Sequence, residues 1–139
     1  MKYYTKTEKE TLVLAKFFAK KLEGGEIVGL TGNLGAGKTI FAKGIAAGLK
    51  IKKNITSPTF VLMKIYQVSE HKQIKFLTHI DAYRIKSAND LISVGINEHL
   101  NRIDTVTIIE WADKIKKILP KKTKFIKITI NKTGRIINF

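Results

Sequence analysis

The feature that most constrains the fold of this chain is the segment GNLGAGKT, residues 32–39, which matches G-x-x-x-x-G-K-[ST] at every fixed position. Its glycines allow the backbone to curve so that several N–H groups point at one phosphate group, and the positive end of the following helix faces the same anion. A short apolar run, EIVGLT, precedes the segment, and TIFAKGIAAGL follows it with apolar residues at helical intervals. The sequence therefore predicts a strand, a phosphate-binding loop and a helix, with a nucleoside triphosphate as the ligand.

The polar residues of this loop have expected roles. Lys38 is predicted to contact the β- and γ-phosphates as a point charge, and the Thr39 hydroxyl to bind Mg²⁺. The loop residues predicted to contact the nucleotide are Gly32, Asn33, Leu34, Gly35, Ala36, Gly37, Lys38, Thr39 and Ile40.

Two carboxylates are candidates for the metal and the hydrolytic step. Glu110 follows the apolar run TVTII and Asp81 follows FLTHI, so each lies at the end of a predicted strand. We expect Thr39 and Glu110 to hold Mg²⁺, with Glu110 acting directly or through a water, and Asp81 to bind the metal's water shell or orient the attacking water. The predicted catalytic residues are Lys38, Asp81 and Glu110. The alternative for each acid is a surface residue that ends a strand.

Four other features of the sequence have to be interpreted. The loop TSPTF, residues 56–60, is either a nucleotide-sensing segment or a plain turn rich in Ser and Thr. Trp111 is expected either to pack on the nucleotide or a partner, or to fill the core, and His79 to lie at the edge of the core. The run ITINKTG resembles the guanine-reading N-K-x-D of GTPases, but Gly134 stands in place of the Asp. ATP is therefore the expected nucleotide.

The order of elements predicts the fold class. Thr7 and Glu10 predict the start of a helix that continues through TLVLAKFFAKKL and ends at Gly24-Gly25. Hairpins are predicted from FVLMKIYQV with QIKFLTHI and from KFIKITI with RIINF, and a short helix from ADKIKKIL. This mixture predicts an α/β, P-loop NTPase-like domain of three layers, with a mostly parallel central sheet and antiparallel additions. At 139 residues we expect a single domain, residues 1–139.

The composition bears on the possible partners of the protein and on its location in the cell. The formal net charge of +15 would attract nucleic acid or an acidic partner, yet 23 of the 26 basic residues are Lys, whereas Arg is preferred for bidentate recognition of phosphate. A solvated Lys-rich surface is the alternative. Cysteine is absent, which excludes disulfides and thiolate chemistry. With neither a long apolar run nor a signal-peptide pattern, we expect a cytoplasmic protein with no membrane contact.

Together these segments resemble the bacterial TsaE family, formerly YjeE, of small P-loop ATPases. The resemblance rests on GNLGAGKT, TSPTFVLMKIY, HIDAYRI, DLISVGINEHL and IIEWADKI, which run in this order from about Gly29 to Ile115. It implies a weak ATPase needed to make threonylcarbamoyladenosine in tRNA. The implied partners are the proteins TsaB and TsaD, which transfer the threonylcarbamoyl group to tRNA. Hydrolysis would reset their complex between turnovers, and tRNA would be met only through that complex.

The resemblance also implies site residues. Thr11 would lie near the adenine and Trp111 near the site, in addition to the loop, Asp81 and Glu110. Two departures stand out: Asn33 replaces the usual Asp, and Ile40 occupies a position where a second Thr or Ser is common.

Two other functions are alternatives for a chain with this loop. A small-molecule or nucleoside kinase would use the same loop, but such enzymes usually need an arginine-bearing lid, and this chain has only Arg84, Arg102 and Arg135. A nucleotide-regulated RNA-binding module would be favoured by the +15 charge and would show strongly salt-dependent binding.

Overall fold

The computed structural model describes residues 1–58 and 61–139 of the chain. In this part of the chain one sheet has seven strands in the order β1-β7-β6-β2-β5-β4-β3. The strands are β1 (Lys2–Thr5), β2 (Ile27–Thr31), β3 (Met63–Gln67), β4 (Phe76–Asp81), β5 (Thr105–Glu110), β6 (Lys124–Asn131) and β7 (Gly134–Asn138). The helices are α1 (Glu8–Ala19), α2 (Lys38–Gly48), α3 (Ala88–Ser93), α4 (Ile96–Leu100) and the 3-10 helix η1 (Ala112–Ile118).

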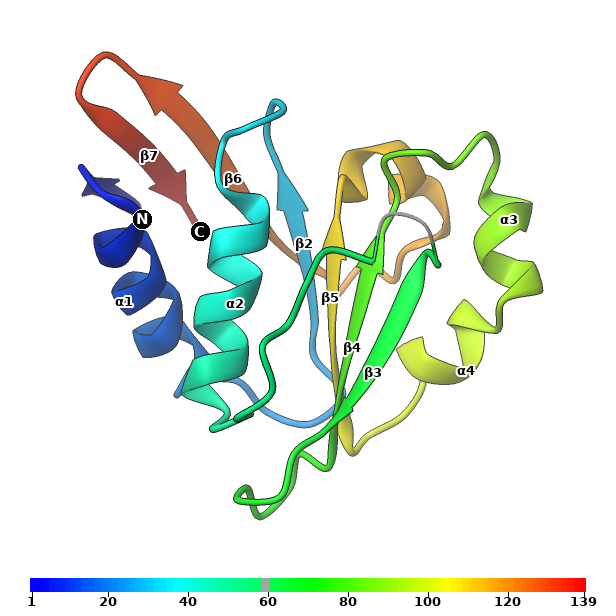
Figure 1. The fold of residues 1–139 in the computed structure, drawn as a ribbon. Coiled ribbons are helices and arrows are strands. Elements are labelled where there is room, and N and C mark those ends of the chain that lie inside the picture. Colours follow the sequence, from blue (N-terminus) through cyan, green and yellow to red (C-terminus); the bar gives the residue numbers. More distant parts are fainter. Residues whose placement is uncertain (59–60) are drawn as a thin grey trace.

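The centre of the sheet is parallel and both of its sides are antiparallel. Strands β6, β2, β5 and β4 run in the same direction, whereas β7 and β1 at one side and β3 at the other oppose their neighbours (Figure 1). The predicted hairpins are present as β3–β4 and β6–β7. The predicted mostly parallel sheet with antiparallel additions is confirmed.

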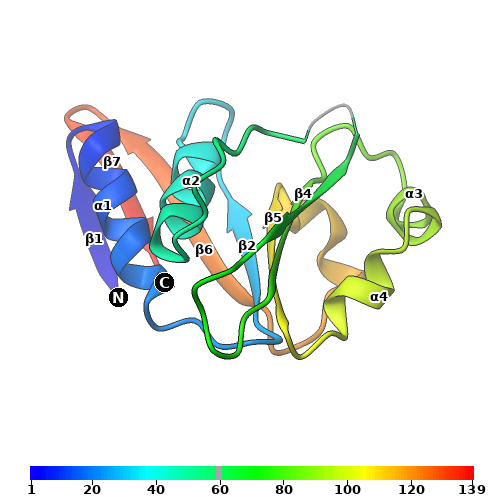
Figure 2. The same cartoon turned by 60° about the horizontal axis from the view of Figure 1, so that its bottom comes forward.

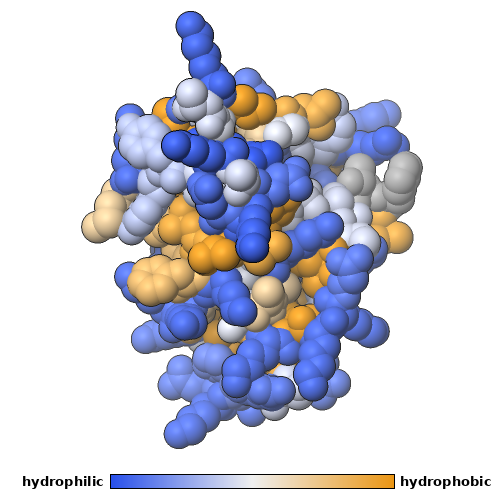
Figure 3. All heavy atoms as spheres, turned by 60° about the vertical axis from the view of Figure 1, so that its left-hand side comes forward, coloured by the Kyte–Doolittle hydropathy of each residue, from blue (hydrophilic) through white to orange (hydrophobic). Residues whose placement is uncertain are grey.

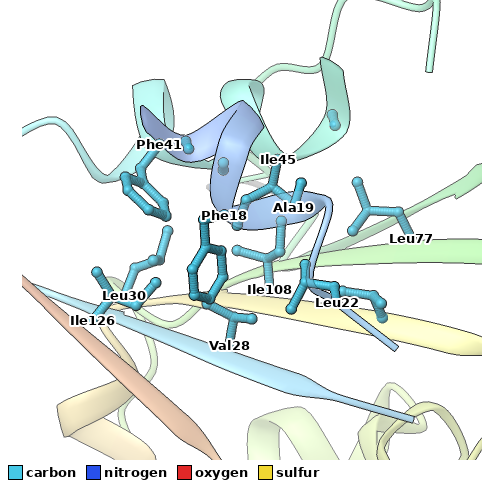
Figure 4. Packing of buried hydrophobic residues seen from close by; sticks show 14 of the residues in the cluster. Phe18, Ala19, Leu22, Val28, Leu30, Phe41, Ile45, Leu77, Ile108 and Ile126 are labelled. Atoms are coloured by element: carbon cyan, nitrogen blue, oxygen red, sulfur yellow. The ribbon is translucent and has the colours of Figure 1, made fainter. Parts of the chain in front are cut away.

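Helices cover both faces of this sheet, which confirms the predicted three layers. Helices α1 and α2 pack on one face, and α3, α4 and η1 on the other (Figure 2). Successive residues of β2 point to opposite faces: Ile27 joins the α3–α4–η1 side, whereas Val28 joins the α1–α2 side. On the latter side Phe18, Phe41 and Ile45 lie over the sheet residues (Figure 4). Burial on both faces explains why the central strands are almost continuously apolar in sequence.

Two helices differ in detail from the prediction. The Thr7 hydroxyl accepts a hydrogen bond from the Glu10 N–H at 3.1 Å, as expected of the cap. Helix α1 nevertheless ends at Ala19 rather than near Gly24-Gly25, because the next N–H groups bond three residues back, as in a 3-10 turn. The predicted helix ADKIKKIL is the 3-10 helix η1, with non-helical backbone at Ile115. In residues 1–58 and 61–139, none of the helices has the length and apolar character needed to cross a membrane.

One strand was not predicted. Residues 2–5 form β1, which pairs antiparallel with β7 at the edge of the sheet, so that Lys2 lies opposite Asn138 and Thr5 opposite Arg135. The run KYYT is too short to show an alternating pattern, and its partner is at the other end of the sequence. Local sequence therefore carries little signal for this pairing.

Small residues allow α1 and α2 to pack closely. Gly44 and Gly48 of α2 face Ala15 and Ala19 of α1. A Cβ atom built on Gly44 would lie 2.5 Å from the Ala15 Cβ and 2.6 Å from the Leu12 carbonyl oxygen. These glycines are thus required by the contact between helices, although glycine is unfavourable inside a helix.

This packing predicts whether a substitution in α2 raises or lowers the free energy of unfolding. Gly44→Ala should lower the free energy of unfolding by about 1–3 kcal/mol through overpacking, although alanine is intrinsically better in a helix by about 1 kcal/mol. The change is measured as the urea midpoint. As a control, Ala47→Gly in the same helix should cost only about 1 kcal/mol. A higher midpoint for Gly44→Ala would contradict the close packing.

Candidate functional site

The loop between β2 and α2 has a conformation that depends on glycine. Gly37 has a φ of 107°, and a Cβ atom there would lie 2.8 Å from the Arg135 Nε. Gly32 has a φ of 140°, and a Cβ atom there would lie 2.2 Å from the Ile128 carbonyl oxygen. Any other residue would be strained at both positions. The loop thus passes close to β6 and β7 before α2 begins at Lys38.

The Lys38 side chain is folded against the loop that precedes it. Its Nζ donates hydrogen bonds to the carbonyl oxygens of Gly32 and Asn33, at 2.6 and 2.9 Å. The same ammonium lies 3.7 Å from the centre of the Trp111 ring, within cation–π distance. Burial lowers the pKa of Lys38, and the nearby carboxylates of Glu110, Asp81 and Asp113 partly oppose that shift. A cation is therefore held at the loop, at the entrance of the predicted phosphate position.

Thr39 and Glu110 are in direct contact. The Thr39 hydroxyl donates to the Glu110 carboxylate, at 2.9 Å from one oxygen and 3.1 Å from the other. This arrangement leaves the hydroxyl oxygen able to accept a cation. Mg²⁺ usually takes one or two protein oxygens and completes its shell with phosphate and water, so the pair fits this ion. The described residues contain no cluster of three or more His, Cys, Asp or Glu that could hold a metal by itself.

Asp81 lies beside this pair and accepts hydrogen bonds from residues on both sides of it in the sequence. One of its carboxylate oxygens accepts from the Ser57 hydroxyl at 2.8 Å and the other from the Tyr83 N–H at 2.8 Å. The loop TSPTF therefore contacts the predicted hydrolytic acid through Ser57. Thr59 and Phe60 of that loop lie outside the described residues.

A cleft of about 450 Å³ brings most of the predicted residues together. Its lining residues are Glu8, Leu34, Gly35, Gly37, Lys38, Thr39, Ile40, Ser57, Asp81, Tyr83, Glu110, Trp111 and Arg135. The ring of Trp111 lies against Tyr83, with 4.8 Å between ring centres, so this side chain faces the cleft and also packs on the core side.

Four predicted residues do not line this cleft. Gly32 and Asn33 border a separate hollow with β6, and Ala36 is 1% exposed below the loop. Thr11 is buried in α1, where its hydroxyl lies 2.8 Å from that of Thr5. For these four residues, as for those that line the cleft, contact with a nucleotide stays a prediction.

Arg135 is a cleft residue for which the sequence analysis assigned no role. It comes from β7, and its Nε donates to the Ala36 carbonyl oxygen at 2.9 Å. A guanidinium nitrogen lies 3.8 Å from a carboxylate oxygen of Glu8. The 99 positions that separate Arg135 from Ala36 leave no local signal. Arg135 reaches the loop because β7 pairs with β6 and β6 pairs with β2, and the pairing of β1 with β7 brings the start of α1 beside it.

Comparisons with known proteins identify the family of this chain. Residues 5–137 match the family model described as "Threonylcarbamoyl adenosine biosynthesis protein TsaE". A relative from Treponema pallidum named "tRNA threonylcarbamoyladenosine biosynthesis protein TsaE" is 35% identical over 134 residues, which cover 96% of this chain and 95% of the relative. A relative of the same name from Rickettsia typhi is 42% identical over 114 residues, covering 81% and 75%.

A solved structure gives the same result. The crystal structure of Bacillus subtilis YdiB matches with a TM-score of 0.79 and 32% identity, over 99% of this chain and 82% of that one. The sequence, the fold and these relatives agree over nearly the whole chain, which confirms the resemblance. The chain belongs to the TsaE family.

Proposed function

We propose that this chain is a magnesium-dependent ATPase of one domain, residues 1–139, that acts in the threonylcarbamoyladenosine modification of tRNA. The observation that carries the proposal is the convergence of Lys38, the Thr39–Glu110 pair and Asp81 in one cleft beside the phosphate-binding loop. The family name supports the pathway. The absence of the guanine-reading Asp, with Gly134 in its place, favours ATP over GTP.

In this proposal each residue of the site has its own role in nucleotide binding or hydrolysis. Backbone N–H groups of the loop and the Lys38 ammonium bind the phosphates, and Thr39 with Glu110 would hold Mg²⁺. Magnesium, when bound, would neutralise negative charge on the phosphate oxygens. Asp81 orients a water whose oxygen bonds to the γ-phosphorus as the bond to the bridging oxygen of ADP breaks. One proton of that water stays on the phosphate product and the other is released.

The same proposal explains how so small a chain can take part in tRNA modification. ATP hydrolysis by this chain would return a cytoplasmic complex of TsaB and TsaD to its starting conformation after each turnover. The chain would then need no site of its own for tRNA, which would be bound through the complex. Ordering of a loop by the γ-phosphate is a known route from hydrolysis to such a change. The contact of Ser57 with Asp81 offers a route by which the loop could respond.

The experiment that tests the function is steady-state ATP hydrolysis by the purified protein, alone and with TsaB and TsaD from the same cell. We expect slow turnover alone and a clear rise with the pair. Rapid turnover that the pair does not change, or phosphate transfer to a small acceptor, would contradict the proposal and favour a kinase.

Removing the loop lysine should prevent nucleotide binding. Lys38→Ala is expected to weaken ATP binding at least about 100-fold, because each lost charge-assisted hydrogen bond contributes about 1.5–3 kcal/mol. Isothermal titration calorimetry measures the effect. Lys43→Ala in the same helix, away from the cleft, serves as the matched control and should bind normally. Unchanged affinity in Lys38→Ala would exclude the assigned role.

Glu110 should affect hydrolysis more than nucleotide binding. Glu110→Ala is expected to lower kcat by about 100-fold, because an electrostatic group that acts on the transition state is lost. ATP affinity measured without Mg²⁺ should not fall, because no metal contact is then lost and a negative charge beside the phosphates is removed. The control is Glu98→Ala, which removes an exposed carboxylate from α4. Full turnover by Glu110→Ala would remove this residue from the mechanism.

A further inference from the structure

His79 of β4 lies directly behind the predicted metal-binding carboxylate. Its side chain is fully buried, and its Nε2 is 2.8 Å from Oε1 of Glu110. Side chains alternate along β4, so His79 shares a face with Asp81, at the cleft, and with Leu77, in the α1–α2 core. The imidazole thus fills the layer between that core and the acids of the cleft.

The hydrogen bonds of the Glu110 carboxylate show which nitrogen of the His79 ring is the donor. An ionised carboxylate only accepts hydrogen bonds, so the Nε2 of His79 is the donor. The His79 Nδ1 is buried and is the one buried side-chain polar atom without a partner in the part of the chain that the structure describes. A buried N–H without an acceptor costs about 1–3 kcal/mol. The tautomer that meets both conditions has its proton on Nε2 and none on Nδ1.

We infer that His79 is a positioning residue for Glu110. Its Nε2–H fixes Oε1, so that the carboxylate keeps both oxygens toward the Thr39 hydroxyl and the metal position next to it. Without this donor, Thr39 alone would orient the carboxylate from the cleft side, and the carboxylate would face an apolar layer behind it. The inference rests on the proposed function, because it concerns the Mg²⁺ that Glu110 would hold.

A purely structural role would have different consequences. If His79 only fills space, an apolar side chain of similar volume should leave metal binding unchanged and alter only stability. If His79 positions Glu110, the lost donor should weaken Mg²⁺ binding even in a folded variant. Groups that orient metal ligands typically contribute about 10–100-fold in metal affinity.

The experiment compares His79→Leu, which removes the donor, with His79→Gln, whose amide N–H can occupy the position of Nε2. Each protein is saturated with a non-hydrolysable ATP analogue and titrated with Mg²⁺, and the fluorescence of Trp111, the only tryptophan, is recorded. We expect Mg²⁺ affinity to fall about 10–100-fold in His79→Leu and about threefold or less in His79→Gln. Analogue affinity in EDTA and the thermal midpoint of each variant report on folding.

Three results separate the possible failures. Wild-type Mg²⁺ affinity in a folded His79→Leu variant would overturn the inference and leave the proposed function standing. A wild-type protein that binds the analogue without any effect of Mg²⁺ would overturn both. In a Glu110→Gln background, adding His79→Leu should cause no further loss of Mg²⁺ affinity. A full additional loss there would show that His79 acts independently of Glu110, against the inference.

If His79→Leu does not fold, the inference can still be tested in the wild-type protein by observing which nitrogen of the His79 ring carries the proton. A nitrogen-15 spectrum of the wild-type protein should show that the His79 ring carries its proton on Nε2, the nitrogen that faces Glu110. The opposite tautomer would overturn the inference, because Nε2 could then not donate to Glu110.

Discussion

The candidate site depends on the parallel register of three neighbouring strands. Leu30 of β2 lies opposite Glu110 of β5, which in turn lies opposite Asp81 of β4. Because these strands run in the same direction, the loop that follows β2 begins beside both acids. Moving β5 by one residue would turn Glu110 to the other face, and moving it by two would shift it about 7 Å along the sheet. Either change would break its 2.9 Å contact with Thr39.

The same register places ionisable groups where water is scarce. Lys38, Asp81 and Glu110 are only 3–5% exposed. Removing one partner of a buried charge pair typically costs about 3–5 kcal/mol, so each of these groups needs the contacts it has. His79 and Thr39 hold Glu110, Ser57 and the Tyr83 N–H hold Asp81, and loop carbonyl oxygens hold Lys38. Each buried charge of the cleft is therefore held by named polar partners.

Local sequence was sufficient for the parts of the fold that short-range chemistry determines. The loop motif, the Thr7 cap and the apolar central strands each depend on residues close in the chain, and so does the position of Glu110 and Asp81 at strand ends. The pairing of β1 with β7 depends on contacts between the two ends of the chain, and the entry of Arg135 into the cleft depends on the pairing of β6 with the distant β2. The role of His79 was missed for the same reason, because its partner Glu110 is 31 positions away.

The charges that line the cleft differ in sign from the molecule as a whole. The chain carries a formal charge of +15, yet the cleft has three acidic side chains, Glu8, Asp81 and Glu110, against two basic ones, Lys38 and Arg135. The excess lysines therefore lie outside the cleft. On the face that Figure 3 shows, hydrophilic side chains surround patches of apolar ones.

A cleft with this balance cannot attract a polyphosphate through its side chains alone. Backbone N–H groups and a helix terminus can supply part of the missing positive charge. A divalent cation between Glu110 and the phosphates would supply the rest and relieve the repulsion between two anions. The charges of the cleft thus support the magnesium dependence that we propose.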